Sequence, residues 1–344
     1  MTRMMDTAAH PGPARIGVAL RRLRDVAWLL VAACGLATPA AAQPAASSSR
    51  ELSIEAGPIR LHGTLQTAQA VAGAEPVLIL AGSGPTDRDG NSPLGVRASP
   101  YRLLAQALAE RGVTSLRVDK RGIGASAAPM GSEADLRLAH FAADARLWAA
   151  ALREQTGARC VWLLGHSEGV LHALLAAEQR EGICGLVLVS GFGRRLDVVI
   201  AEQLRANPAN APILDEALHI LAELTAGRPV PGDRVSPALA PLFRPSVQPF
   251  MIDMLSRDPA DLVRSFPGPV LVVQGTTDLQ TRVADAERLA GARPGVALRL
   301  VEGMNHVLKT APADRAANFA TYSNPDLPLA PGLIDPIAAF LLAN

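Results

Sequence analysis

Short, almost entirely apolar runs alternate with stretches of helical periodicity, and this alternation constrains the fold more than any other feature. Runs that are apolar on both faces are typical of parallel strands covered by helices on both sides. Strand and helix in alternation predict the α/β class. We therefore expect a mostly parallel central sheet with helices on both faces, spanning residues 51–344. The predicted strands are residues 52–56, 59–66, 77–80, 113–118, 161–164, 186–189, 270–273 and 298–301.

Helical periodicity falls at residues 101–111, 135–155 and 170–179. Apolar residues recur at three-four spacing in the second stretch, and Ser132 with Asp135 predicts a capping box at its start.

One long segment, residues 194–265, has no strand pattern. Prolines, which a sheet tolerates poorly, separate helical patterns at residues 198–204, 213–224 and 250–255. The strand pattern resumes at Val270, so we expect a helical cap insertion over the strand ends rather than a separate domain.

The first 42 residues have the pattern of a secretory signal peptide. Arginines precede the apolar run 26–37, and a small-residue site ends at Ala42, followed by a polar linker over residues 43–50. The run is shorter than the ~20 residues that span a bilayer, so we expect no transmembrane span in the mature chain. We expect a periplasmic or secreted protein. In an alternative interpretation, Val31-Ala32-Ala33-Cys34 resembles a bacterial lipobox, and Cys34 carries a lipid anchor.

Two cysteines remain inside the predicted domain, and each directly precedes a predicted strand. If the strands after Cys160 and Cys184 are parallel neighbours, about 4.8 Å apart, the thiols lie at one edge of the sheet within reach of a disulfide. An oxidising compartment would permit the bond. Two buried free thiols are the alternative, and the sequence leaves both open.

Composition excludes several classes of partner and cofactor. The formal net charge is +1 and the charges are dispersed, so no basic stripe indicates nucleic-acid binding. Asp87, Asp89 and Asn91 imitate the start of a calcium loop, but Ser92 and Ala98 replace its glycine and its bidentate glutamate. The cysteines lack metal-ligand spacing. We expect no metal and no cofactor.

The segment Gly165-His166-Ser167-Glu168-Gly169 lies between a predicted strand and a predicted helix. A nucleophile on so tight a turn has strained backbone angles, and glycines two positions away on either side relieve the crowding. We expect Ser167 to be a catalytic nucleophile.

A serine hydroxyl needs a base within hydrogen-bond reach. His306 is the only histidine after the insertion and follows the last predicted strand. His166 adjoins the serine, but its ring is expected to point away from the site. The other candidates lie on strand or helical patterns: His62, His140, His172 and His219. We expect His306 to be the base.

An acid is expected to orient the base and stabilise its protonated form. Asp278 follows the predicted strand 270–273, whereas its nearest rival, Asp285, falls on the next helix. The resulting order is serine, aspartate, histidine.

The oxyanion that forms on the reacting carbonyl needs preorganised donors. We expect one to be the backbone N–H of Glu168, at the start of the helix after the serine. The other is expected in the loop Ala81-Gly82-Ser83-Gly84-Pro85, as the backbone N–H of Ser83.

These motifs resemble those of the α/β-hydrolase superfamily, in particular its bacterial serine esterase, lysophospholipase and serine aminopeptidase-like branch. The residues that carry the resemblance are 82–85, 119–126, 165–169, 275–280 and 305–308. The family commonly has histidine before the glycine of the oxyanion loop, where this chain has Ala81, so the support of that loop is open. The motif at 119–126 is interpreted as structural, a loop that orders the strand ends.

Together these features predict a secreted serine hydrolase that cleaves a small-molecule carboxylic ester through an acyl-enzyme. A peptidase or amidase on the same residues is one alternative. An aminopeptidase would need carboxylates of the insertion, Glu202, Asp215, Glu216 and Glu223, to converge on a free amine. A non-catalytic binding protein of the same fold is the other alternative.

Overall fold

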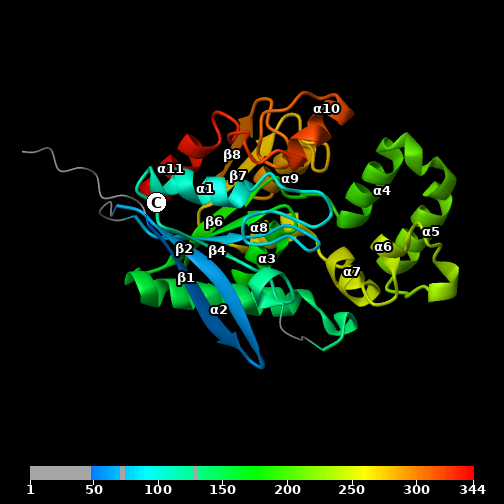
Figure 1. The fold of residues 1–344 in the computed structure, drawn as a ribbon, viewed down its shortest axis with the longest axis horizontal. Helices are drawn as coiled ribbons and strands as arrows, with labels where there is room; N and C mark the ends of the chain where they lie inside the picture. Colours follow the sequence, from blue (N-terminus) through cyan, green and yellow to red (C-terminus); the bar gives the residue numbers. More distant parts are fainter. Residues whose placement is uncertain (1–47, 70–73, 128–130) are drawn as a thin grey trace, which may run out of the picture. The chain divides into compact units, whose positions relative to one another are not determined.

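The computed structural model describes residues 48–69, 74–127 and 131–344. The predicted signal peptide, Cys34 and the start of the predicted linker lie outside the described residues. Within the described ranges the chain forms an eight-stranded sheet with the order β1-β2-β4-β3-β5-β6-β7-β8 (Figure 1). The strands are β1 Ser48–Ala56, β2 Ile59–Thr67, β3 Val77–Leu80, β4 Ser115–Val118, β5 Val161–His166, β6 Ile183–Val189, β7 Val270–Gly275 and β8 Val296–Val301.

From β4 to β8 every neighbouring pair is parallel, whereas β1 and β2 pair antiparallel with each other and β2 with β4. Because parallel strands run in the same direction, the loops after β3, β5, β7 and β8 all leave from one edge of the sheet. The predicted mostly parallel α/β sheet is confirmed.

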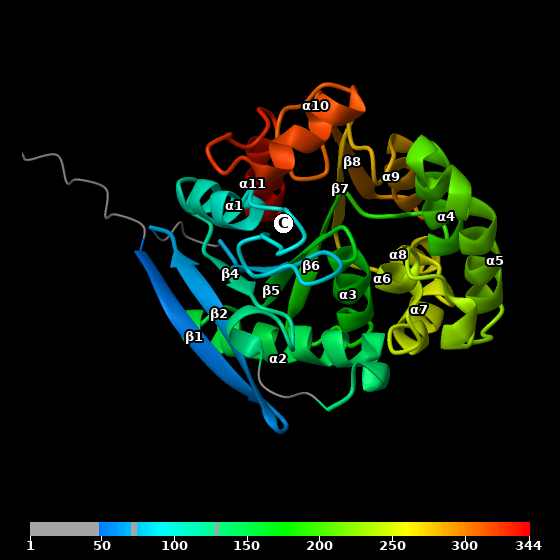
Figure 2. The ribbon, with the colours of Figure 1, turned by 45° about the vertical axis from the view of Figure 1, so that its right-hand side comes forward.

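Helices cover both faces of this sheet (Figure 2). Neighbouring residues of a strand face opposite sides, so in β3 Leu78 and Leu80 pack in one apolar cluster with α2 and α3, and Val77 and Ile79 in another with α1 and α11. The helices are α1 Pro100–Ala109, α2 Leu138–Thr156, α3 Gly169–Ala176, α4 Leu196–Ala206, α5 Leu214–Thr225, α6 Ala240–Phe243, α7 Gln248–Leu255, α8 Pro259–Ser265, α9 Val283–Ala290, α10 Arg315–Ala320 and α11 Ile334–Ala343.

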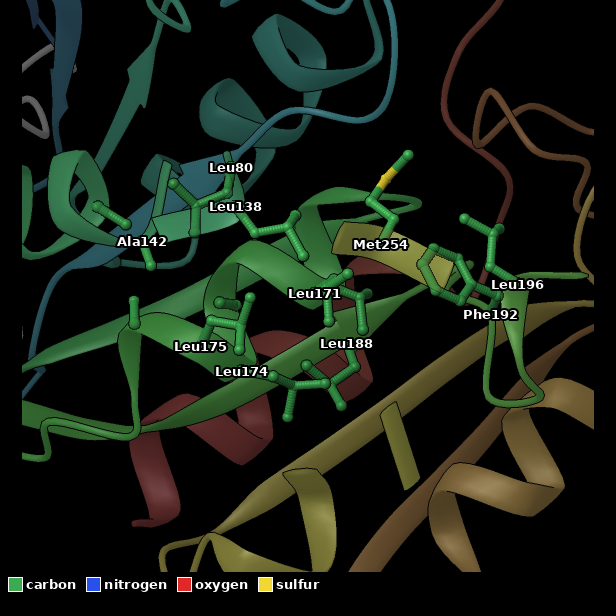
Figure 3. Close-up of a cluster of buried hydrophobic side chains, with 14 of the residues drawn as sticks. Leu80, Leu138, Ala142, Leu171, Leu174, Leu175, Leu188, Phe192, Leu196 and Met254 are labelled. Carbon is green, nitrogen blue, oxygen red and sulfur yellow. The ribbon is translucent and has the colours of Figure 1, made fainter. Parts of the chain in front are cut away.

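Residues 194–265, all of them described, contain helices α4 to α8 and no strand. We call this segment the helical insertion. It is anchored on the main core, because side chains of α4 and α7 pack in the same apolar cluster as β3, α3 and β6. Figure 3 shows this cluster, with Leu80, Leu138, Ala142, Leu171, Leu174, Leu175, Leu188, Phe192, Leu196 and Met254 labelled.

The predicted start of the long helix is wrong. Ser132 caps a short 3₁₀ turn, Glu133–Asp135, and α2 begins only at Leu138. Two extended residues separate the turn from the helix, and the backbone N–H of Leu138 donates to Asp253 of α7 at 2.9 Å. A tertiary contact with the helical insertion therefore satisfies this N–H, beside a local cap in which the N–H of Arg137 donates to Nδ1 of His140.

The two cysteines form a disulfide. Cys160 and Cys184 lie 5.1 Å apart at Cα, directly before β5 and at the second residue of β6. Of the two arrangements that the sequence left open, the structure has the bonded one, at the edge of the sheet opposite the loops that follow β5 and β7.

Candidate active site

Ser167 lies on the sharp turn between β5 and α3, with a φ of 55°. This is the left-handed region, which is strained for a side chain other than glycine. A Cβ at Gly165 would lie 2.3 Å from the carbonyl oxygen of Gly169, and a Cβ at Gly169 would lie 2.3 Å from that of Leu80. Both glycines are therefore needed for the chain to make this turn beneath the serine.

His306 follows β8, and its Nδ1 lies 2.9 Å from Oδ2 of Asp278, which follows β7. An ionised carboxylate only accepts hydrogen bonds, so Nδ1 carries the proton and Nε2 keeps its lone pair. The two loops are tied together, because the N–H groups of Thr276 and Thr277 donate to the carbonyl oxygens of Val301 and Met304. This pairing of loops holds the acid beside the imidazole.

Asp278 is buried, and burial by itself would raise the pKa of its carboxyl. His306 and the backbone N–H groups of Thr281 and Gln280 instead hold that pKa below its ordinary value. The rival acid, Asp285, binds the Arg194 guanidinium at 2.9 Å and the start of its own helix. It serves to anchor the beginning of the helical insertion.

Ser167 and His306 line one cavity of about 260 Å³, which Ser83 also lines. Asp278 does not line this cavity and is connected to it through its bond to His306. The Ser167 hydroxyl makes no hydrogen bond to another residue within the described ranges, so serine and imidazole share a cavity without direct bonding. Catalytic hydrogen bonds are often long before substrate binds.

The two backbone N–H groups expected to bind an oxyanion are unengaged. Neither the N–H of Ser83 nor that of Glu168 donates to any described residue. A Cβ built on Gly82 would lie 3.1 Å from Cβ of Ser167, so the loop that carries Ser83 packs directly against the serine.

Lys120 supports this loop from the side away from Ser83's N–H. Its Nζ donates to the carbonyl oxygens of Gly82 and Gly84, the latter at 2.8 Å. In a trans peptide the carbonyl of Gly82 and the N–H of Ser83 point in opposite directions. By holding the carbonyl, Lys120 fixes the direction of that N–H.

A second cavity, of about 560 Å³, opens beside the first and shares Gly84 and Pro85 with it. The helical insertion contributes Val247 and Phe250 to its wall, and the body of the fold contributes Ile123, Leu136 and Phe141. The arginines in the wall are paired in ion pairs, Arg121 with Asp144 and Arg244 with Glu133. The free surface of this cavity is therefore mainly apolar.

Glu168 also lines that wall and carries a charge. Burial alone would raise the pKa of its carboxyl, but His172 and Lys120 hold it below its ordinary value, so the group stays ionised. Its Oε1 lies 3.4 Å from Nε2 of His172.

Three residues around the serine were not assigned to the site from sequence: Tyr101, Lys120 and His166. The expected outward direction of the His166 ring is wrong, since its centroid lies 4.9 Å from that of His306 and its Nε2 bonds the His306 carbonyl. The ring is held there by its bonds to the His306 carbonyl and the Tyr101 hydroxyl. For Lys120, the sequence signal that could have found it was its place in the motif 119–126, which was interpreted above as structural.

No group of three or more His, Cys, Asp or Glu side chains that could hold a metal ion occurs in the described ranges, and no described helix is long and apolar enough to cross a membrane.

Comparison with known proteins gives matches over most of the chain. A family model described as serine aminopeptidase, S33, matches residues 94–312. Esterase EstD of Thermotoga maritima is 27% identical over 238 residues, which make up 67% of this chain and 54% of EstD. The chain thus spans about half the length of that curated relative.

Two solved structures share the fold. Proline iminopeptidase of Mycobacterium smegmatis has a TM-score of 0.53 at 19% identity and covers 76% of this chain and 92% of its own. Est1E of Butyrivibrio proteoclasticus has a TM-score of 0.51 at 16% identity and covers 86% and 99%. At these identities the likeness extends to the fold alone.

Proposed function

The chain belongs to the serine aminopeptidase S33 family of α/β-hydrolases, and we propose that it is a secreted serine hydrolase that cleaves carboxylic esters. Ser167 is the nucleophile of this proposal, His306 the base and Asp278 the acid that orients the base. The observation that supports it most directly is the 2.9 Å contact between His306 Nδ1 and Asp278, beside a cavity that Ser167 lines.

The reaction begins when Ser167 Oγ attacks the ester carbonyl carbon and its proton passes to the lone pair of His306 Nε2. Asp278 keeps the proton on Nδ1 and stabilises the imidazolium that forms. The carbonyl oxygen becomes an oxyanion, which accepts hydrogen bonds from the backbone N–H groups of Ser83 and Glu168.

The tetrahedral intermediate then collapses. The bond between the carbonyl carbon and the alcohol oxygen breaks, and the alcohol leaves with the proton of His306 Nε2. A water molecule gives a proton to Nε2 as its oxygen attacks the acyl carbon, and Ser167 recovers its proton when the acid product leaves.

An ester is favoured over an N-terminal peptide by the carboxylates of the helical insertion. Glu202 binds Arg194, Glu223 binds Arg228 and Glu216 accepts from the N–H of Ser236. Asp215 is exposed, and none of the four lines either cavity beside Ser167. The apolar wall of the 560 Å³ cavity suits an acyl chain.

An aminopeptidase is the second candidate, and Glu168 is the observation that favours it. Its ionised carboxylate lines the larger cavity one residue from the nucleophile, where it could bind an α-ammonium group.

Two measurements test the proposal. A fluorophosphonate should label the protein at Ser167, and Ser167→Ala should abolish the labelling; a protein that remains unlabelled is a binding protein of this fold. Nitrophenyl esters of increasing acyl length and amino-acid anilides should then be compared by kcat/KM. Faster turnover of an anilide than of every ester would favour the aminopeptidase.

Export to the periplasm or medium is supported by the N-terminal sequence pattern and by the disulfide, which is typical of oxidising compartments. Mass spectrometry of the mature protein from cell fractions tests it. A chain that begins at Gln43 supports cleavage by signal peptidase, a lipidated Cys34 supports the anchored form, and an unprocessed cytoplasmic chain contradicts export.

A further inference from the structure

A chain of three hydrogen bonds passes behind the candidate site. The backbone N–H of Gly82 donates to the hydroxyl oxygen of Tyr101 at 3.0 Å, and that hydroxyl lies 2.8 Å from Nδ1 of His166. On the other side of its ring, His166 Nε2 lies 2.8 Å from the carbonyl oxygen of His306. The chain joins the loop after β3 to the loop after β8 through α1 and β5.

The donor and acceptor of each bond can be assigned by starting from the His306 carbonyl. A carbonyl oxygen only accepts, so Nε2 of His166 carries the proton that it donates to His306. Nδ1 is then an acceptor and takes the hydroxyl proton of Tyr101. The tyrosine oxygen is left to accept from Gly82, so all three bonds are satisfied by one proton arrangement.

Both side chains are fixed in this arrangement. Tyr101 is 2% exposed and His166 is 4% exposed. Burial, together with repulsion from His306, lowers the pKa of His166 to about 3, and burial raises the pKa of Tyr101. Each therefore keeps its neutral form over the pH range in which a hydrolase is assayed.

We propose that Tyr101 and His166 are positioning residues that hold the oxyanion loop and the base loop at a fixed separation across Ser167. The chain ends on backbone atoms, one residue before the Ser83 N–H at one end and at His306 itself at the other. Lys120 binds the carbonyl of Gly82, and Tyr101 binds its N–H, so both polar atoms of that residue are held. The inference rests on the proposed function, since it assigns these residues through the roles of Ser83 and His306.

The test compares Tyr101→Phe, His166→Asn and His166→Gln. The glutamine amide can still reach the His306 carbonyl as a donor, whereas the shorter asparagine retains only the side that faces Tyr101. We expect kcat for an ester to fall by about 10- to 100-fold in Tyr101→Phe and in His166→Asn, with KM within about threefold of wild type. His166→Gln keeps the bond to the His306 carbonyl but breaks the one to Tyr101, so it should lose about as much kcat as Tyr101→Phe.

The double variant Tyr101→Phe/His166→Asn tests whether the two side chains act together. If the hydrogen-bond chain acts as one unit, the double variant should lose little more activity than the less active of the two single variants. Losses that multiply, or a fall in kcat of less than about threefold in both single variants, would overturn the inference.

Leu108→Ala is the matched control. Leu108 is buried on the same helix, α1, in the cluster that contains Tyr101, but it makes no hydrogen bond to either loop of the hydrogen-bond chain. It should lower the melting temperature and leave kcat unchanged; an equal loss of kcat would show that loosening α1 is sufficient, which contradicts a specific role of Tyr101.

The rate constant for fluorophosphonate labelling of Ser167 separates this inference from the proposed function. Wild-type protein that does not label contradicts the proposed function. Wild-type protein that labels, with variants that label at the same rate, contradicts the positioning role alone.

Discussion

The ammonium group of Lys120 donates a hydrogen bond to the carbonyl oxygen of Gly82, 38 residues earlier in the chain. This contact supports the predicted oxyanion loop, whose support the sequence left open at Ala81. Burial lowers the pKa of Lys120, while the charge of Glu168 opposes that shift. The loop is thus held by a cation that the negative charge of Glu168, the residue after Ser167, stabilises.

Lys120→Met should lower kcat by about 10- to 100-fold, because the Gly82–Ser83 peptide loses the contact that fixes the direction of the Ser83 N–H. KM should change little, since the Lys120 ammonium group acts through the backbone carbonyls of Gly82 and Gly84 and not through a contact with the substrate. Steady-state kinetics on a nitrophenyl ester measure the effect, and circular dichroism checks that the variant is folded. A folded variant with kcat near that of wild type would show that the loop keeps its shape without the ammonium group.

Removing the disulfide should weaken the fold without affecting the chemistry. The bond closes a loop with a sequence separation of 24, for which loop-closure entropy predicts a contribution of about 3 kcal/mol. Strand β5 separates Cys160 from Ser167 by about 20 Å. The variant Cys160→Ser/Cys184→Ser should therefore unfold at lower urea concentration and retain wild-type kcat. Equal stability with and without the bond, measured by urea denaturation, would contradict this account.

The sequence predicted the sheet, and it placed the candidate site residues after its strands, because both depend on local patterns. Apolar runs define parallel strands, and their carboxyl ends bring Ser167, Asp278 and His306 to one edge. Contacts between distant segments left no such pattern. The start of α2 was misplaced because its first N–H bonds Asp253 of the helical insertion, and its local cap joins Arg137 to His140. The predicted direction of the His166 ring was wrong because its partners, Tyr101 and the His306 carbonyl, are 65 and 140 residues away in the sequence.

The buried neutral His166 should make the protein less stable in mild acid. Its pKa falls from an ordinary 6.5 to about 3 in the fold, so between these values the unfolded chain binds more protons and stability falls as the pH falls. From pH 6.5 to 4.5 the loss through this one group should be about 2 kcal/mol. His166→Gln, which cannot titrate, should show a shallower decline in the free energy of unfolding over that interval. Parallel curves for the two proteins, from urea denaturation at several pH values, would mean that His166 is not held neutral.

The apolar cavity of about 560 Å³ should determine how long an acyl chain the enzyme accepts. Each methylene group that leaves water for an apolar wall contributes about 0.8 kcal/mol, which is roughly a fourfold gain in kcat/KM. Val247 lies in that wall on the helical insertion, and Val247→Trp would fill part of the space beside Phe250.

In wild type, kcat/KM for nitrophenyl esters should therefore rise with acyl length until the cavity is full, whereas in Val247→Trp the rise should stop at a shorter chain. The acetate ester should react at a similar rate in both proteins, because its acyl group adds a single methyl beside Ser167, in a cavity that Val247 does not line, and it serves as the internal control. Phe250→Ala enlarges the same wall and should shift the optimum toward longer chains. If both variants keep the chain-length profile of wild type, the acyl group lies elsewhere, and the smaller cavity beside Ser83 is the remaining candidate for its binding.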